Sequence, residues 1–261
     1  MRVKPDTTDL PTLPQSAHHL RPRCATDPSF PSTAAESDAV TGDAMLPFSQ
    51  AQFLAVFADY NATVWPAQLI AYLVGLITVG ALVQRTAASS RIIGVSLGVM
   101  WIWTGVVYHG LYFSAINKAA VAFGAIFVIQ GLGLVYAGLA KRFGPSLRSE
   151  RSEWNEWIGW VLVVYSIVIY PLIGLAAGHR RLDLPMFGMT PYPVTIFTFG
   201  AMLLVRNTVP RWLLVVPSLW SLIGGSAAFL LGVPQDWLLL ASGIVATPLL
   251  LQDRIGRAVG P

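Results

Sequence analysis

Long apolar runs without formal charge recur along the chain and are separated by short polar stretches. The run Trp212–Leu231 holds twenty residues and no charge, which suits a helix that crosses roughly 30 Å of hydrocarbon. Six further runs follow the same pattern, at Pro66–Val83, Ile92–Phe113, Ala119–Ala140, Trp157–Ala177, Met186–Val205 and Trp237–Leu251. The pattern therefore predicts an all-α fold, a polytopic transmembrane helix bundle of about seven spans. Glycine and prolines interrupt the first half of Met186–Val205, so six spans is the alternative.

The distribution of Lys and Arg favours seven spans. Connections after odd-numbered runs, together with the C-terminal tail, carry ten basic residues: Arg85, Arg91, Lys141, Arg142, Arg148, Arg151, Arg206, Arg211, Arg254 and Arg257. Connections after even-numbered runs carry only Lys118, Arg180 and Arg181. The positive-inside rule then places the C-terminus in the cytoplasm and Met45 outside. Without the fifth span the later connections would change sides and the asymmetry would be lost.

Two segments precede the first run. Residues 1–44 contain six prolines and few bulky apolar residues, which predicts a disordered leader; alternatively, Met45 is the true initiator. Within residues 45–63, Ser49 and Gln52 have the spacing of a capping box, and Phe48 can pack on Phe53. These features predict a short amphipathic helix that lies along the membrane interface or packs on the bundle. The predicted organisation is thus a leader at 1–44, an interfacial helix at 45–63, a transmembrane domain at 64–251 and a cytoplasmic tail at 252–261.

Composition supports a membrane protein and excludes several other classes. Of 261 residues, 54% are apolar and 11% are charged, against about a quarter charged in soluble domains. The net charge of +4 does not indicate a nucleic-acid partner, because the basic residues lie in short connections. The single cysteine, Cys24, excludes an internal disulfide and a thiolate metal cage. No catalytic or phosphate-binding motif and no metal-ligand spacing is present, so no catalytic residue, metal or cofactor is predicted.

Small residues mark two predicted helix-packing seams. In lipid, helices associate through close backbone approach and polar pairs. Gly94, Gly98 and Gly105 fall on one side of the second run, and a second stripe contains Ser221, Gly224 and Gly225 of the sixth run. We expect both stripes to face neighbouring helices.

A few polar residues within the runs are candidates for a site. Gln130 lies near the centre of the third run, where an amide either bonds a neighbouring helix or lines a cavity. His109, on the glycine side of its helix, either packs as a satisfied histidine or binds a ligand. Tyr165 and Tyr170 flank a predicted kink, because Pro171 cannot donate to the carbonyl of the residue four positions earlier. Pro217 and Pro248 likewise free the carbonyls of Leu213 and Ile244. No Asp, Glu, Lys or Arg lies deep within a run, which argues against an ion pump with a buried carboxylate.

The stretch Gly178–Thr195 is the most irregular part of the predicted membrane domain. Its glycines and prolines exclude a continuous helix, and non-helical backbone at membrane depth must be buried in protein or line water. A helix that begins at Thr190-Pro191 or Tyr192-Pro193, close to His179, Arg180 and Arg181, would form an electropositive pocket for an anionic group; an ordinary outer loop is the alternative. The candidate polar pocket therefore comprises His109, Gln130, Tyr165, Tyr170, His179, Arg180, Arg181, Thr190 and Thr195.

Several motifs resemble one family. They are Met45-Leu-Pro-Phe-Ser49, Gln52-Phe-Leu-Ala-Val-Phe57, Trp103-Thr-Gly-Val-Val-Tyr-His109, Tyr170-Pro171, Gly178-His-Arg180, Thr195-Ile-Phe-Thr-Phe-Gly200 and the run from Pro217 to Ser226. Together they are similar to the uncharacterised bacterial membrane family DUF6064, over nearly all of Met45–Leu251. The resemblance implies a bacterial inner-membrane protein and transfers no activity.

Three functional classes remain open at this point. A small-solute carrier or channel-like protein is favoured by the broken fifth run and the kinked helices. A membrane scaffold or partner subunit is the alternative, supported by the small-residue seams. A membrane-embedded enzyme comes third, because His109, Tyr165 and His179 have no evident catalytic partner. The expected partners are the lipid bilayer and a small-molecule ligand; a homo-oligomer stays open.

Overall fold

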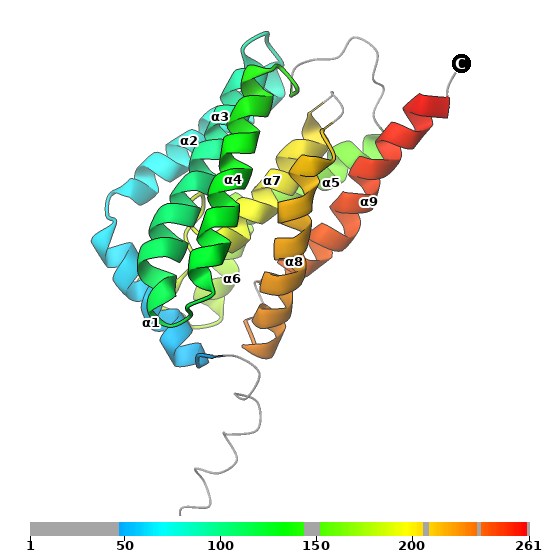
Figure 1. Cartoon of the computed structure of the whole chain (residues 1–261). Coiled ribbons are helices and arrows are strands. Elements are labelled where there is room, and N and C mark those ends of the chain that lie inside the picture. Colours follow the sequence, from blue (N-terminus) through cyan, green and yellow to red (C-terminus); the bar gives the residue numbers. More distant parts are fainter. Residues whose placement is uncertain (1–46, 144–151, 206–208, 234–235, 260–261) are drawn as a thin grey trace, which may run out of the picture. The chain divides into compact units, whose positions relative to one another are not determined.

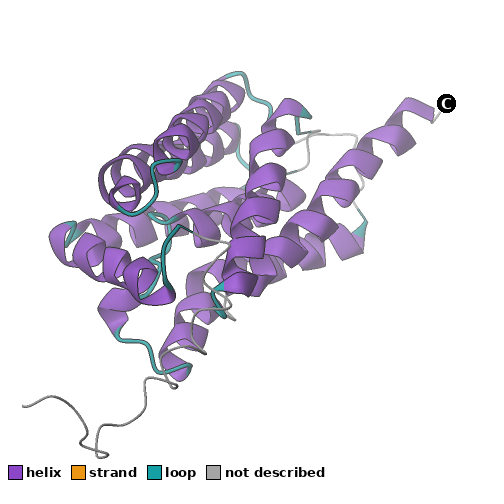
Figure 2. Cartoon of the chain, turned by 60° about the horizontal axis from the view of Figure 1, so that its bottom comes forward, coloured by secondary structure: helices purple, strands orange, loops and turns teal. Residues whose placement is uncertain are grey.

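The described part of the protein is built from helices alone. The computed structural model describes residues 47–143, 152–205, 209–233 and 236–259, and for 253–259 it describes only the helix. Every regular element in these ranges is helical (Figure 2), which confirms the all-α prediction for them. The predicted leader, Cys24 and Met45 lie outside the described residues.

The first helix, α1 (Gln50–Thr63), begins as its sequence predicts. Ser49 accepts a hydrogen bond from the backbone N–H of Gln52, and its own N–H donates to the Gln52 side chain over 2.9 Å. The ring of Phe48 stacks on that of Phe53 with centroids 5.9 Å apart. Phe53 and Phe57 are buried, so α1 packs on the bundle through one face.

The remaining helices follow the predicted runs closely. They are α2 (Ala67–Gln84), α3 (Ser89–Trp103) continued by the π-helix η2 (Thr104–Tyr112) and the 3-10 turn η3 (Phe113–Ala115), α4 (Ala120–Leu139), α5 (Glu153–Val164) continued by the π-helix η4 (Tyr165–Ile169) and α6 (Tyr170–Ala176), the 3-10 turn η5 (Arg181–Asp183), α7 (Pro191–Leu204), α8 (Trp212–Leu230) and α9 (Trp237–Val259). The second π-helix ends two residues before Pro171, where the proline disrupts the regular ladder.

Five of these helices are long and apolar enough to cross a membrane. In the described ranges they are Ala67–Gln84, Ser89–Ala115, Ala120–Leu139, Glu153–Ala176 and Trp212–Leu230. Two shorter apolar helices, Pro191–Leu204 and Trp237–Gln252, correspond to the fifth and seventh predicted runs. The coarse prediction of several helices long and apolar enough to span a membrane is confirmed; the count of seven remains a prediction.

The helix connections gather at two ends of the bundle (Figure 1). At one end, which we call the α1 end, Phe48 packs on Phe113 and the Gln50 side chain donates to the Leu231 carbonyl. At the other, the Arg85 end, Arg85 forms an ion pair with Glu156 over 2.6 Å. The helices therefore run back and forth between these ends.

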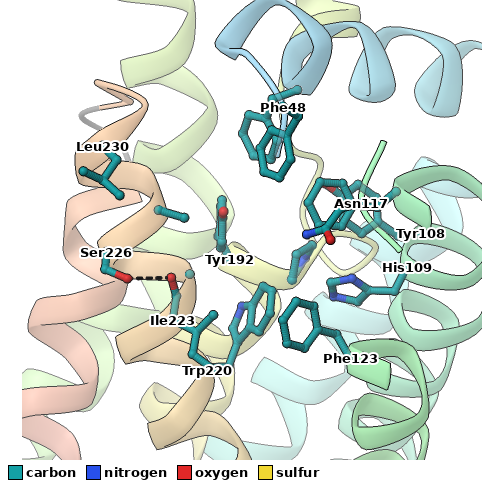
Figure 3. A pocket seen from close by; sticks show the side chains of 15 residues that line it. Phe48, Tyr108, His109, Asn117, Phe123, Tyr192, Trp220, Ile223, Ser226 and Leu230 are labelled. Atoms are coloured by element: carbon teal, nitrogen blue, oxygen red, sulfur yellow. Dashed lines mark hydrogen bonds between the residues drawn. The ribbon is translucent and has the colours of Figure 1, made fainter. Parts of the chain in front are cut away.

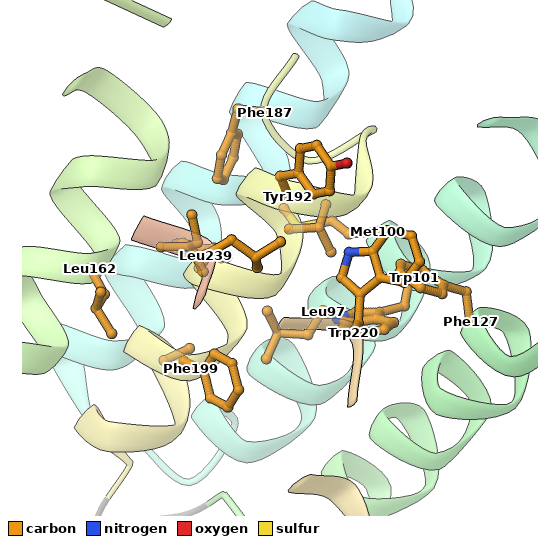
Figure 4. Close-up of a cluster of buried hydrophobic side chains, with 14 of the residues drawn as sticks. Leu97, Met100, Trp101, Phe127, Leu162, Phe187, Tyr192, Phe199, Trp220 and Leu239 are labelled. Atoms are coloured by element: carbon orange, nitrogen blue, oxygen red, sulfur yellow. The ribbon is translucent and has the colours of Figure 1, made fainter. Parts of the chain in front are cut away.

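Helix α7 forms the centre of the core. Every residue from Pro191 to Leu204 is buried, as expected for a helix that is apolar on all sides. Figure 4 shows large side chains from several other helices, among them Trp101, Leu162 and Leu239, gathered around it. Trp101 also donates from its indole N–H to the Thr198 hydroxyl over 2.9 Å. Protein, and not lipid or water, therefore surrounds this helix.

The irregular segment before α7 is buried beneath α1 and α2. Residues 184–190 are buried except Met186, which is half-buried. Asn61 donates to the carbonyls of Leu182 and Leu184 over 2.7 and 2.8 Å, and the Tyr60 hydroxyl donates to Met189 over 2.9 Å. Side chains of α1 thus satisfy backbone carbonyls that no helix ladder satisfies.

Glycines bring α3 and η2 into close contact with α4. A Cβ placed on Gly94, Gly98 or Gly105 would lie 2.6 Å from a carbonyl oxygen of α4, namely that of Leu134, Gly131 or Gly124 respectively. Real Cβ atoms are not found so close to an oxygen, so each position requires glycine. The second stripe also faces its neighbours: Gly225 meets Leu240 of α9, and Gly224 meets Tyr192 of α7.

Candidate functional site: an aromatic cavity at the α1 end

A cavity of about 300 Å³ lies at the α1 end, between η2, α4, α8 and the start of α7 (Figure 3). Most of its wall is aromatic, and none of the described side chains that line it carries a formal charge. The lining residues are Phe48, Phe53, Tyr108, His109, Phe113, Asn117, Phe123, Pro191, Tyr192, Trp220, Ile223, Gly224, Ser226, Ala227 and Leu230. Such a wall suits a neutral and largely apolar molecule.

The π-helix η2 places two consecutive side chains inside the protein. Tyr108 stacks on Phe57 of α1 with ring centroids 5.3 Å apart. His109 points between α4 and α8, with its ring centroid 4.7 Å from Phe127 and 5.1 Å from Trp220. The close contact between η2 and α4 at Gly105 and Gly124 allows the imidazole to reach this position.

The imidazole of His109 has no hydrogen-bond partner among the described residues. The side chain is 0% exposed, and neither Nδ1 nor Nε2 is bonded within the described part of the chain. A neutral imidazole offers one donor and one acceptor. An unsatisfied buried polar group costs about 1–3 kcal/mol, so His109 favours a bound molecule that can bond to it.

Trp220 adds a second unsatisfied group to the same wall. Its indole N–H is buried and unbonded within the described ranges. The ring of Tyr192 stacks against the Trp220 ring with centroids 6.1 Å apart. Figure 3 shows the His109, Phe123 and Trp220 rings converging on one region of the cavity. Donor and acceptor groups therefore meet on a largely apolar surface.

The cavity reaches the surface beside α8. Ile223, Ser226 and Leu230 are exposed, and Asn117 in the connection before α4 is half-buried. A molecule would therefore enter between α8 and the α3–α4 connection.

A buried carboxyl lies close behind this cavity. Asp236, in the connection between α8 and α9, is 0% exposed and accepts a hydrogen bond on Oδ1 from the Tyr170 hydroxyl. Its Oδ2 has no partner in the described ranges. Burial raises the pKa of Asp236 to about 8, and the Tyr170 hydrogen bond opposes this rise. Leu239, one turn after Asp236, and the cavity-lining Tyr192 both lie against Gly224, which also lines the cavity.

The comparisons with known proteins identify the family. The model of the family of unknown function DUF6064 matches residues 50–259. The chain belongs to this family. No curated protein and no solved structure matches it.

The DUF6064 match begins at the first residue of α1 and ends at the last residue of α9. It therefore includes all residues that line the cavity except Phe48. The family resemblance expected from the motifs is confirmed.

The structure separates the residues of the predicted polar pocket. Of these, only His109 lines the cavity. Gln130 is 2% exposed and donates to the Leu213 carbonyl over 2.9 Å. Tyr170 bonds Asp236, and the ring of Tyr165 lies edge-on to it with centroids 6.1 Å apart.

The basic residues before α7 lie apart from the cavity. Arg180 and Arg181 are exposed, and Arg180 forms an ion pair with Asp183 over 2.9 Å. His179 is half-buried and does not line the cavity. Thr190 and Thr195 are buried, and their hydroxyls donate to carbonyls one turn earlier, at Met186 and Pro191. An electropositive pocket built from these residues is not evident in their contacts.

Two functional candidates were missed by sequence reasoning. Asp236 lies between two apolar runs and not within one, so the argument against a buried carboxylate overlooked it. An Asp directly before a helix is ordinarily interpreted as an N-cap, which hides its burial. Trp220 lies within the range that the family model matches, but periodicity alone does not show that its N–H lacks a partner.

Proposed function

We propose that this DUF6064 protein is a multi-pass inner-membrane protein that binds a small, neutral, largely apolar molecule in the cavity beside His109. One observation carries this proposal: both imidazole nitrogens of His109 and the N–H of Trp220 are buried, unbonded within the described chain and adjacent to the same cavity. Buried polar groups in folded proteins are nearly always bonded. A ligand with a hydrogen-bonding group would satisfy them once the two rings turn toward the cavity, because none of the three atoms is itself exposed in the structure.

The dimensions and lining of the cavity define the class of ligand. A cavity of about 150 Å³ holds one benzene molecule, so about 300 Å³ accommodates a molecule of bicyclic size. The absence of charged side chains from the lining disfavours an ion. An aromatic or alicyclic molecule with one carbonyl or hydroxyl group fits both the wall and the unpaired donors.

In the proposed topology α7 and α9 complete seven spans, with the Arg85 end in the cytoplasm. Arg85, Arg91, Lys141, Arg142 and Arg211 belong to connections or helix starts at that end, as the positive-inside rule favours. Helix α7 need not match the bilayer thickness, because its neighbours enclose it. The cavity then lies in the outer half of the protein, and its entrance beside α8 is reached from the outer interface.

We favour a carrier over a scaffold. A scaffold has no need of a cavity with unpaired polar groups. The cavity is open at the α1 end, whereas glycine contacts hold α3 and α4 together toward the Arg85 end. This arrangement is compatible with one state of a carrier. Transport would require the Arg85 end to open in turn.

Binding can be tested with coumarin, a neutral bicyclic molecule with a carbonyl acceptor, and with naphthalene, which lacks the acceptor. Calorimetry on the full chain in lipid nanodiscs should show tighter binding of coumarin. His109→Phe and Trp220→Phe should each weaken coumarin binding about 2- to 10-fold, as expected for one lost hydrogen bond, with little effect on naphthalene. Trp154→Phe, at a tryptophan that is 72% exposed, is the matched control. Equal affinities for the two molecules, unchanged in all variants, would refute the proposal.

Spin labels can test the carrier class. Labels at Ala87 and Trp154, both exposed at the Arg85 end, report the distance between the α2–α3 turn and the start of α5. A carrier should show a second distance whose population changes when coumarin is added. A single unchanged distance, with coumarin bound, would favour a static binding protein or scaffold.

A further inference from the structure

The pair formed by Asp236 and Tyr170 joins two distant parts of the chain inside the protein. Asp236 precedes α9, and Tyr170 begins α6. Both residues are at most 1% exposed. The carboxyl has one hydrogen-bond donor, on Oδ1, and none on Oδ2 among the described residues.

Within the described ranges, no positive charge compensates Asp236. The titratable groups that face it there are Tyr108 of η2, Tyr165 of η4, Tyr170 of α6 and Tyr192 of α7. None of the ion pairs found in the described ranges includes Asp236. An ionised carboxylate with one hydrogen bond and no cation is costly in such surroundings. Binding a proton removes that cost.

The same tyrosines connect the carboxyl to the cavity. Tyr108 and Tyr192 line the cavity, and Tyr192 lies against Gly224 together with Leu239, one turn after Asp236. A molecule bound in the cavity displaces water from the space in front of these tyrosines. The dielectric around Asp236 then falls further, which favours the protonated carboxyl.

We propose that Asp236 is a proton-binding site, and that proton binding at Asp236 and ligand binding in the His109 cavity favour one another. The coupling rests on the proposed function, whereas the proton site stands without it. One proton adds to one carboxylate oxygen, and no other group changes its charge. By linkage, the ligand binds more tightly to the protonated protein, and the protonated fraction rises when the ligand binds.

The proton site is tested without any ligand. Infrared difference spectra of the full chain in nanodiscs, recorded from acid to alkaline pH, should contain a protonated-carboxyl band that disappears with a midpoint near pH 8. Asp236→Asn should remove this band. Asp59→Asn, at an exposed carboxyl of the same end, should not. The hydrogen bond from Tyr170 stabilises the ionised form of Asp236. Tyr170→Phe removes this bond and should therefore shift the midpoint to higher pH. A band that persists in the Asp236→Asn variant would overturn the assignment.

The coupling is tested with coumarin, whose own charge does not change in this pH range. Calorimetry in buffers of different ionisation heat should show proton uptake when coumarin binds near pH 8, and Asp236→Asn should abolish the uptake while coumarin still binds. Uptake that is equal in wild type and variant would overturn the coupling. If coumarin does not bind but the infrared band behaves as described, the cavity proposal and the coupling fail and the proton site remains.

Discussion

The side-chain amide of Gln130 donates to the backbone carbonyl of Leu213 over 2.9 Å, inside the contact between α4 and α8. Leu213 lies four residues before Pro217, which has no N–H, so its carbonyl lacks the donor that an uninterrupted helix would supply. Gln130 therefore replaces a helix hydrogen bond with one between helices. The polar residue in α4 and the proline in α8 compensate for one another.

A double-mutant cycle can test this compensation. Gln130→Met should destabilise the protein by about 1–3 kcal/mol, because the Leu213 carbonyl becomes unsatisfied. Pro217→Ala restores an N–H to α8, so Gln130→Met should cost less in that background. The measurement is reversible unfolding in mixed micelles. Additive effects would show that the two residues are independent.

The seam between α3 and α4 predicts a sharp difference between two glycines. Gly94→Ala forces its Cβ to 2.6 Å from the Leu134 carbonyl oxygen, so the helices must separate, at a cost of about 1–3 kcal/mol. Gly80→Ala in α2 meets no atom within 4 Å and should leave stability within about 1 kcal/mol of wild type. Thermal unfolding of both variants in the same detergent provides the comparison. Similar losses in the two variants would contradict the packing.

The stability of the protein should depend on pH through Asp236. Its pKa is about 8 in the folded protein and about 3.8 when unperturbed, so between these values the folded state binds more protons than the unfolded state. Stability should therefore fall as pH rises through this window. In Asp236→Asn, this dependence of stability on pH should disappear, and in Asp59→Asn it should remain. Melting temperatures at a series of pH values are the readout; a wild-type slope in Asp236→Asn would show that another group is responsible.

The segment before α7 should loosen when its polar support is removed. Asn61→Ala leaves the carbonyls of Leu182 and Leu184 without their donor, at a cost of about 1–3 kcal/mol. Hydrogen exchange should accelerate in residues 182–190 and remain unchanged at the Arg85 end. Thr63→Ala, which removes an exposed hydroxyl of the same helix, is the control. Uniform acceleration in both variants would indicate global destabilisation instead.

Topology can be measured by cysteine labelling. In a Cys24→Ser background, Asp59→Cys at the α1 end should react with an impermeant maleimide on intact spheroplasts. Ala87→Cys at the Arg85 end should react only after lysis. Both positions are exposed. The reverse pattern would show that the proposed orientation is inverted. If both positions were labelled on intact spheroplasts, they would lie on the same side of the membrane, and α2 would not cross it.

Much of the fold was predictable because its signals are local. The uncharged run Trp212–Leu231 and the capping box at Ser49 depend on neighbours in sequence, and both helices begin where expected. The bond of Gln130 could be anticipated only as one of two alternatives, because its partner is 83 residues away.

The site was less accessible to sequence reasoning, because it depends on contacts between distant residues. The lack of a partner for His109 is a property of the assembled cavity and not of its helix. Asp236 lies outside the apolar runs, and its burial results from tertiary contacts such as that with Tyr170, 66 residues away. Arg180 is a case in which the sequence suggested a site that the contacts do not support. Its charge suggested an anion-binding pocket, but its side chain is exposed and pairs with Asp183, three residues later.

The enclosure of α7 has a consequence for how this protein is made. A helix of fourteen residues is shorter than the roughly 20 that a lone span requires, and its surroundings are side chains of α5, α8 and α9. In the proposed topology, a nascent chain that ends before Trp212 lacks two of these walls, so α7 cannot settle in the bilayer until α8 and α9 have been synthesised. Late truncations should therefore yield chains that cellular proteases clear, even though most of the apolar spans are intact.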